Sequence, residues 1–435
     1  MKYRARIVMG LLVWAGTVSA ASVEERLATL EARLEQQVSA REAQMTARIQ
    51  QLEQQVLRLQ TEAAFAVQSP GREALAQDGL PDRVAALETK LAGVEGQVAV
   101  VAEEHAANPL KDIVLGGYGE LHYNGLTGSG GAPNKRELDF HRFVLTISKK
   151  FDERTRFFSE LELEHVMAGE GQRGSMALEQ AYIDFDLNDR HTLRGGLFLL
   201  PVGLINTAHE PSRFYGVERN PVENQIIPTT WWEGGAGVYG QLTDTLRYDA
   251  YLHSGLKTTK AKNYAIREGR ERVAYASASD PAGTVALNWS RPGITVGGSV
   301  QYQLDVTQGG DPDPVPALFG EGHVDLQHGR WGLRMLYAQW NLSGDGPQAV
   351  GADSQYGWYI EPSYRLTDTL GLFTRYSSWD NRAGASSANS GKEQANFGVN
   401  WQPREQVSVK ADYQMQFNED GKDQDGVNLG LGYEF

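Results

Sequence analysis

Apolar and polar residues alternate over most of this chain, from residue 113 to its last residue. A period of two residues is typical of β-strands, in which successive side chains point to opposite faces. The segments that show it most clearly are IVLGGYGELHY, RFVLTISKKF, RFFSELELEHV, AYIDFDL, LRYDAYLHS, ITVGGSVQYQL, GWYIEPSY, QANFGVNWQ and VSVKADYQMQF. The pattern predicts an all-β structure for residues 113–435.

The connections between these segments differ in length. Short, turn-forming connections lie at residues 152–154, 188–190, 243–245, 290–293, 328–330, 366–369 and 403–406, and longer polar segments lie between them. Seven short turns and eight long loops predict sixteen antiparallel strands. An even number of strands, with short turns at one rim and long loops at the other, is typical of an outer-membrane β-barrel.

A soluble β-sandwich or propeller is the alternative interpretation. Aromatic residues lie near the ends of several predicted strands, as in the aromatic girdle of a membrane barrel. Examples are Tyr123, Trp289, Tyr302, Trp331, Tyr364, Trp401 and Phe417. The girdle and the strand count both favour a transmembrane barrel.

The chain ends on the same alternation, in the sequence DGVNLGLGYEF. Chain ends fray unless tertiary structure holds them, so we expect this last strand to pair with the first, near residues 113–123, and to close the barrel. A terminal aromatic residue after such a strand also resembles the signal by which the barrel assembly machinery recognises its clients. We therefore expect Phe435 to act as an assembly signal.

The first residues have a different character. Basic residues within the first six precede a short apolar stretch that ends in Val18-Ser19-Ala20, which is typical of a secretory signal peptide. As a helical anchor, this stretch is too short to span a bilayer of about 30 Å. We expect residues 1–21 to be a signal peptide and the mature protein to reach the outer membrane of a Gram-negative cell.

Residues 22–105 predict helices. Between residues 27 and 59, apolar residues recur every eleven residues, which favours a straight to slightly right-handed coiled coil. After a linker at about residues 68–81, a heptad pattern runs from Leu80 to Val101. Such narrow stripes need partner helices, most simply from sister subunits, and a monomeric helical hairpin is the alternative. We expect an oligomer with a periplasmic coiled-coil stalk, for which peptidoglycan is a candidate partner.

Charge and motif content exclude several functions. The formal net charge of −14 is unsuited to nucleic acid, which requires a basic surface. The absence of cysteine removes disulfides and thiolate chemistry. No HExxH, HxxxH or GxSxG motif and no phosphate-binding loop with lysine occurs. We expect no enzyme activity, no cofactor and no metal site.

One long segment carries a family resemblance. RGGLFLLPVGLINTAHEPSRFYGVERNPVENQIIPTTWWEGGAGVYGQL combines a Gly-Gly strand, a Pro-x-Gly break, a long loop with a Glu-Arg pair and a return through Gly-x-Gly. With RELDFHRFVLTISKKF and LEQAYIDFDL, it resembles the phosphate-selective porin family, of the porin O and porin P type, over roughly residues 113–435. The resemblance implies a trimeric channel whose third long loop, at about residues 201–230, folds into the lumen and narrows it.

An anion filter requires a ring of basic side chains. The alternation places more acidic than basic side chains on the lumen side. The candidate pore-lining residues are Arg142, Arg194, Arg213, Arg219, Glu210, Glu218, Glu160, Glu162 and Glu164. The arginines are candidates for binding anions, the loop glutamates would modulate them, and the three glutamates of one strand favour cations or polar solutes. The alternative is that most of these charges pair across strands and only solvate the lumen.

A basic cluster lies in the fourth long loop, in the sequence GLKTTKAKNYAIREGRER. By the topology we expect it to face outside, where it would gather anions at the mouth, bind lipopolysaccharide phosphates or be only solvated. The predicted function is passive diffusion of small hydrophilic solutes, with anions or phosphate as candidate preferred solutes. A porin for dicarboxylates or other organic solutes and a structural barrel that tethers the envelope are the alternatives.

Overall fold

The computed structural model describes residues 112–166, 171, 173–384 and 389–435, together with eight helical residues between positions 47 and 93. The chain divides after Lys111 into two units, and the second unit, Asp112–Phe435, contains the described strands. The expected signal peptide, and the expected stalk apart from those eight residues, lie outside the described residues. In the part of the chain that the structure describes, no helix is long and apolar enough to cross a membrane.

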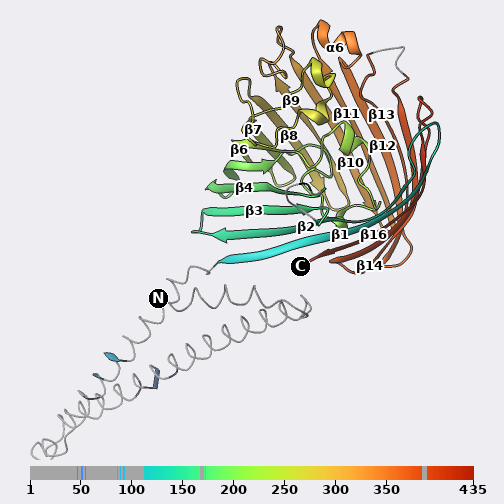
Figure 1. Cartoon of the computed structure of the whole chain (residues 1–435). Coiled ribbons are helices and arrows are strands. Elements are labelled where there is room, and N and C mark those ends of the chain that lie inside the picture. The colour runs from blue at the N-terminus through green and yellow to red at the C-terminus, as the bar shows by residue number, and fades with distance from the viewer. Residues whose placement is uncertain are drawn as a thin grey trace, which may run out of the picture. The chain divides into compact units, whose positions relative to one another are not determined.

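The second unit is a closed antiparallel barrel of sixteen strands (Figure 1). The strands are β1 (Ile113–Gly128), β2 (Lys135–Lys150), β3 (Thr155–Glu164), β4 (Ser175–Asn188), β5 (His191–Leu199), β6 (Trp232–Thr243), β7 (Leu246–His253), β8 (Ala282–Arg291), β9 (Ile294–Gln303), β10 (Ala317–His328), β11 (Trp331–Leu342), β12 (Ser354–Arg365), β13 (Leu370–Asp380), β14 (Lys392–Arg404), β15 (Val407–Gln416) and β16 (Gln424–Glu434). The predicted sixteen strands, seven short turns and eight long loops are confirmed.

The long loops contain the short helices of this unit. These are η1 (Pro211–Arg213), α5 (Val222–Gln225), η2 (Lys260–Lys262), η3 (Ile266–Gly269) and α6 (Asp345–Val350). The first two lie in the loop between β5 and β6, residues 200–231, called L3 here. The next two lie in the loop between β7 and β8, residues 254–281, called L4.

Side chains on the strands alternate between an apolar outer face and a polar inner face. On β16, Val427, Leu429 and Leu431 are 42%, 45% and 40% exposed, whereas Asn428 between them is fully buried. This is the pattern of a barrel whose outside faces lipid and whose inside faces a polar lumen.

The first and last strands close the barrel. β1 and β16 lie side by side in Figure 1, and they pair from Tyr118 opposite Glu434 to Gly128 opposite Gln424. Beyond that ladder, Phe435 N donates to Gly117 O (2.9 Å) and Gly117 N donates to Phe435 O (3.0 Å). The expected pairing of the two strands is confirmed. The paired part of β1 is residues 117–128 rather than 113–123. Phe435, the last residue, lies opposite Gly117, so the first residues of β1 extend beyond the end of β16.

Two β-bulges interrupt the alternation on the β1–β4 wall. Glu120 pairs with Arg142 and Leu121 with Phe140, which leaves His141 as the extra residue of β2. Likewise, Glu160 pairs with Gln180 and Leu161 with Leu178, which leaves Glu179 as the extra residue of β4. A bulge re-aims side chains, and here Glu179 and its neighbour Gln180 are both buried on the inner side.

Deletion of Phe435 is expected to impair barrel assembly more than conduction. The deletion removes both hydrogen bonds to Gly117 and the terminal ring, which stacks on Phe143 at the closing seam with 5.8 Å between ring centroids. The amount of folded, heat-modifiable barrel in the outer membrane should fall several-fold, while the single-channel conductance of the remaining protein stays near that of the wild type.

The matched control is Phe417→Ala, which removes another aromatic ring that is 53% exposed and that follows the end of β15 rather than lying on either closing strand. It should assemble almost normally. Wild-type levels of the protein without Phe435 in the outer membrane would reject an assembly role for this residue.

Candidate functional site in the barrel lumen

The two ends of L3 are held together by hydrogen bonds where the loop leaves the wall. The side chain of Asn206 joins the two ends of the loop, because its Nδ2 donates to Leu200 O (2.7 Å) and to Trp231 O (2.9 Å) while its Oδ1 accepts from Trp231 N (2.7 Å). All three residues are buried. Because its two ends are joined, L3 forms a closed loop whose remaining residues extend away from the rim.

The body of L3 reaches the opposite wall. Lys410 Nζ on β15 donates to Gly216 O (3.0 Å), and Asp412 Oδ2 on the same strand accepts from Val217 N (2.8 Å). Lys410 also lies 3.7 Å from the ring centroid of Phe214. L3 thus crosses the lumen from β5 to β15, which confirms the implied insertion of this loop.

Glu223 is the central anchor of L3. Its Oε1 accepts from Leu204 N (2.6 Å) and Ile205 N (2.7 Å), and its Oε2 accepts from Asn220 Nδ2 (2.9 Å) and from Tyr359 OH on β12 (2.9 Å). The side chain is fully buried. One carboxylate therefore holds two parts of the loop and the wall together.

L4 also folds inward, against L3. Arg270 Nη1 donates to Pro228 O and Thr230 O (both 2.8 Å), and Arg267 donates to Asn224 O. The expectation that this basic cluster faces outside is therefore wrong for Arg267 and Arg270, although Lys260, Lys262 and Arg272 are exposed. The reason is apolar burial, which draws the segment that carries these arginines onto a core inside the barrel.

That inner core joins both loops to the β10–β12 wall. Its fully buried members include Ile226 and Ile227 of L3, Leu256 and Ile266 of L4, and Trp340 of β11. Trp340 Nε1 donates to Ile226 O at 3.0 Å, so its polar atom is satisfied as well. Burial of apolar surface thus fixes the loops on this side of the lumen.

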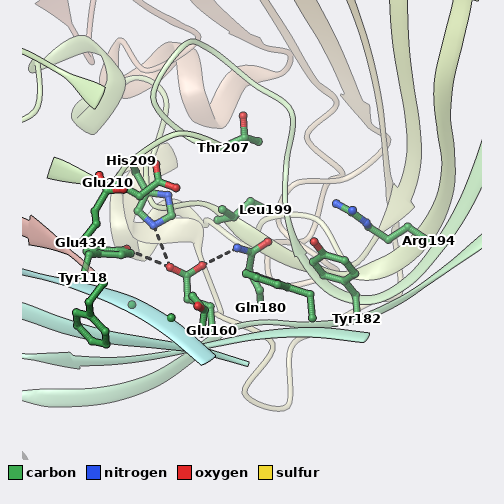
Figure 2. Close-up of a pocket in the computed structure, with 15 residues that line it drawn as sticks. Tyr118, Glu160, Gln180, Tyr182, Arg194, Leu199, Thr207, His209, Glu210 and Glu434 are labelled. Carbon is green, nitrogen blue, oxygen red and sulfur yellow. Dashed lines mark hydrogen bonds and ion pairs between the residues drawn. The ribbon is translucent and has the colours of Figure 1, made fainter. Parts of the chain in front are cut away.

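Polar cavities lie on the opposite side, against β1–β5. One, of about 230 Å³, lies toward the long loops and is called the loop-side cavity; it is lined by Arg142, Glu162, Glu164, Glu179, Arg219, Arg267, Arg270 and Arg272, among others. The other, of about 440 Å³, lies toward the short turns and is called the turn-side cavity. Figure 2 shows the side chains around it, among them Tyr118, Glu160, Gln180, Arg194 and His209.

The arginines of the wall are paired with carboxylates on the same or adjacent strands. The pairs are Arg142 with Glu120, Arg194 with Asp184 (2.8 Å), Arg247 with Asp249 (3.0 Å), Arg334 with Asp325 (2.9 Å) and Arg375 with Glu361 (3.2 Å). Their charges are therefore compensated at short range, which leaves the wall little net attraction for a passing anion.

The arginines of the loops are placed differently. Within the described residues, Arg219, Arg267 and Arg270 form no ion pair with a carboxylate, and Arg219 Nη1 donates instead to Thr230 Oγ1 at 2.8 Å. Burial, together with the neighbouring charges of Arg267 and Arg272, lowers the pKa of Arg270 to about 10. The smaller part of this lowering of the pKa, which comes from Arg267 and Arg272, reflects positive charge close to Arg270.

The other predicted site residues have separate positions. Arg213 is exposed and lies 3.8 Å from Glu210, on η1. Glu218 accepts from Asn124 Nδ2 (3.0 Å) and lies 3.2 Å from His122. Glu160 and Glu162 are buried on the inner wall, whereas Glu164 accepts from Ser175 Oγ (2.7 Å) at the loop-side cavity.

Sequence reasoning missed two residues of the lumen, His209 and Glu179. Glu179 lies at a bulge, so the alternation predicts an outward side chain for it. His209 lies in L3, where no repeating pattern assigns it a direction. Burial opposes the charged form of His209, but the carboxylates of Glu160 and Glu179 outweigh burial and raise the pKa of His209 to about 9.

A closed barrel of sixteen strands, with a polar lumen narrowed by an inward-folded third loop, defines an outer-membrane porin. The family model for phosphate-selective porin O and P matches residues 117–435, and the chain belongs to this family. A relative described as an uncharacterized protein of Aquifex aeolicus (strain VF5) is 31% identical over 358 residues, which cover 75% of this chain and 80% of the relative.

Two solved structures are similar in fold. The anion-selective porin from Comamonas acidovorans has a TM-score of 0.52 at 12% identity, with 74% of this chain and 99% of that chain covered. The outer membrane channel DcaP of Acinetobacter baumannii has a TM-score of 0.51 at 14% identity, with 74% and 97% covered. At these identities the likeness concerns the barrel fold alone.

The substitution Glu223→Ala is expected to loosen L3. It removes four hydrogen bonds, each contributing about 0.5–1.5 kcal/mol, and leaves the buried N–H of Ile205 and the half-buried N–H of Leu204 without their partner. Single-channel recordings should show a larger and noisier conductance than in the wild type, because L3 no longer keeps one position.

Tyr359→Phe is the control for this substitution, since it removes one of the four hydrogen bonds and keeps the ring. Its conductance should stay close to that of the wild type. A quiet, unchanged conductance in Glu223→Ala would show that the apolar core alone positions L3.

Proposed function

We propose that this porin conducts small hydrophilic anions by passive diffusion and that inorganic phosphate is among its preferred solutes. The observation that carries the proposal is the contrast between the two sets of arginines. Those of the wall are neutralised by carboxylates, whereas Arg219, Arg267 and Arg270 meet at the loop-side cavity without such partners among the described residues.

The physical basis is the replacement of an anion's hydration shell. Guanidinium groups present several N–H donors in a plane, which suits phosphate and carboxylate oxygens. Half-buried guanidinium groups are less screened than exposed ones, so their field acts on ions inside the cavity. A cation meets the same groups as a repulsive barrier.

Acidic residues of the same cavity modulate this attraction. Five glutamates line it, namely Glu120, Glu162, Glu164, Glu179 and Glu218. The alternation also places more acidic than basic side chains on the lumen side of the strands, so the proposed selectivity depends on the loop arginines rather than on the wall. The family description names phosphate selectivity, and the Comamonas porin of similar fold is described as anion-selective. Both support the same assignment for this chain.

The proposal also covers the oligomeric state of the porin and its partners in the cell envelope. We propose a homotrimer in the outer membrane, with residues 22–105, for which the sequence predicts helices, as a periplasmic stalk that reaches toward peptidoglycan. Exposed lysines of L4, such as Lys260 and Lys262, would contact lipopolysaccharide phosphates at the outer surface. Phe435 would be read by the barrel assembly machinery during insertion.

Organic anions such as dicarboxylates are the second candidate solutes. The observation in their favour is a wide outer vestibule of about 950 Å³ that Arg219 also lines. Competition of chloride current by phosphate and by succinate distinguishes the two, since the preferred solute blocks the current at the lower concentration.

Arg219→Gln is expected to reduce anion preference. The substitution removes one positive charge that has no carboxylate partner among the described residues but keeps a polar side chain that can donate hydrogen bonds. In planar bilayers under a salt gradient, the reversal potential should shift toward the cation side, corresponding to a several-fold loss in the ratio of anion to cation permeability.

Lys260→Gln removes one positive charge from the exposed part of L4 and serves as the matched control. It should shift the reversal potential much less than Arg219→Gln. Cation preference of the wild-type channel would overturn the proposed function.

A further inference from the structure

Three buried side chains lie close together where the first part of L3 contacts strands β3 and β4. Glu160 projects inward from β3, Glu179 from the bulge of β4, and His209 from L3, and each is no more than 3% exposed. One donor atom from each lies within 4.8 Å of the other two. Figure 2 shows His209 above Glu160, with its ring pointing to the carboxylate.

The imidazole ring of His209 has a fixed orientation. A carbonyl oxygen can only accept, so His209 Nδ1 donates to Asn206 O at 3.1 Å. Its Nε2 then points to Glu160 Oε1 at 3.5 Å and to Glu179 Oε2 at 3.6 Å. A hydrogen bond between a metal-binding histidine and a carbonyl group orients the other ring nitrogen toward a metal in the same way.

Two of these converging atoms have no hydrogen-bond partner. His209 Nε2 and Glu179 Oε2 are both buried and unsatisfied within the described residues. Buried polar atoms normally find a partner, because leaving one unmet costs about 1–3 kcal/mol. The two unsatisfied atoms lie 3.6 Å apart, so one ligand bound between them would satisfy both.

The separations match a bound metal ion. Nitrogen and oxygen ligands at about 2.0–2.2 Å from zinc in a tetrahedron lie about 3.3–3.6 Å from one another. The distances of 3.5 and 3.6 Å from His209 Nε2 to the two carboxylates fall in this range. They are too long for good hydrogen bonds.

We propose that Glu160, Glu179 and His209 form a binding site for a divalent transition-metal ion, with zinc as the preferred ion, that ties L3 to the β3–β4 wall. One imidazole and two carboxylates suit zinc and similar ions. Two carboxylates also balance the charge of the ion. The turn-side cavity, which Glu160 and His209 line, leaves room for a water molecule as the fourth ligand.

Neighbouring side chains hold the ligands in place. Tyr118 OH donates to Glu160 Oε1 (3.1 Å), and Gln180 Nε2 donates to Glu160 Oε2 (2.5 Å). Arg142 Nη2 donates to His209 O (2.6 Å), which fixes the backbone of L3 at this point. Such surrounding hydrogen bonds orient the ligands of metal sites.

The proposed metal site differs from the sequence-based expectation that the protein has no metal site. Its ligands come from three separate elements, so no short motif announces it. The consequence for the channel is that the metal holds L3 in a single position.

Zinc binding to the detergent-purified full-length porin tests the proposal. The protein is treated with EDTA, transferred to phosphate-free buffer and titrated with zinc chloride by calorimetry. A second cluster, Asp139, His141 and His165, is more exposed and could bind zinc too. All proteins therefore carry His165→Gln, and this background should retain one tight zinc ion per chain.

Glu179→Gln and His209→Gln, each in that background, are expected to weaken zinc binding at least about 100-fold, beyond the 10- to 100-fold typical of losing a surrounding residue. Heat-modifiable migration on gels shows that each variant folds. Cobalt(II) gives a second readout, since a tetrahedral site produces visible absorption bands that both variants should lose.

The proposal is wrong if the background protein binds no zinc. It is also wrong if both folded variants bind zinc as tightly as the background. Neither result depends on ion selectivity, so the proposed anion preference is tested separately.

Discussion

Closure of the barrel is the constraint on which the rest of this structure depends. Hydrocarbon offers no partner for backbone N–H and C=O groups, so every strand in a membrane must pair on both edges. The pairing of β1 with β16, completed by the hydrogen bonds between Gly117 and Phe435, removes the last free edges. It also separates an outer apolar face from an inner polar one, and it fixes the wall on which both inner loops rest.

Inside that wall, L3 and L4 form a second packing unit with its own core. Apolar residues such as Ile226 and Ile266 join the loops to Trp340 of the wall, while Glu223 ties L3 to Tyr359 through a buried hydrogen bond. The lumen is therefore apolar and filled on one side and polar on the other. The space that remains for solutes lies on the polar side, against β1–β5.

Charge is divided between the wall and the loops. Wall arginines such as Arg142 and Arg194 are close to carboxylates that the strand pairing brings next to them. Loop arginines such as Arg219 and Arg270 have no such carboxylate neighbour, because they lie on L3 and L4 and strand pairing does not place an acidic residue beside them. The bulge at Glu179 adds a carboxylate to the wall where His209 arrives from L3, which is how a metal site and an arginine cluster can occupy adjacent cavities.

The sequence by itself determined the barrel. A period of two, the spacing of the turns and the closing strand at Phe435 are local features, and they are set by the demand that alternate side chains face lipid or lumen. The tertiary structure alone decided the site. The inward turn of Arg267 and Arg270 depends on burial of Ile266, and the inward aim of Glu179 depends on one extra residue in a strand. Neither effect leaves a periodic signal, because loop packing and bulges depend on contacts between residues far apart in the chain.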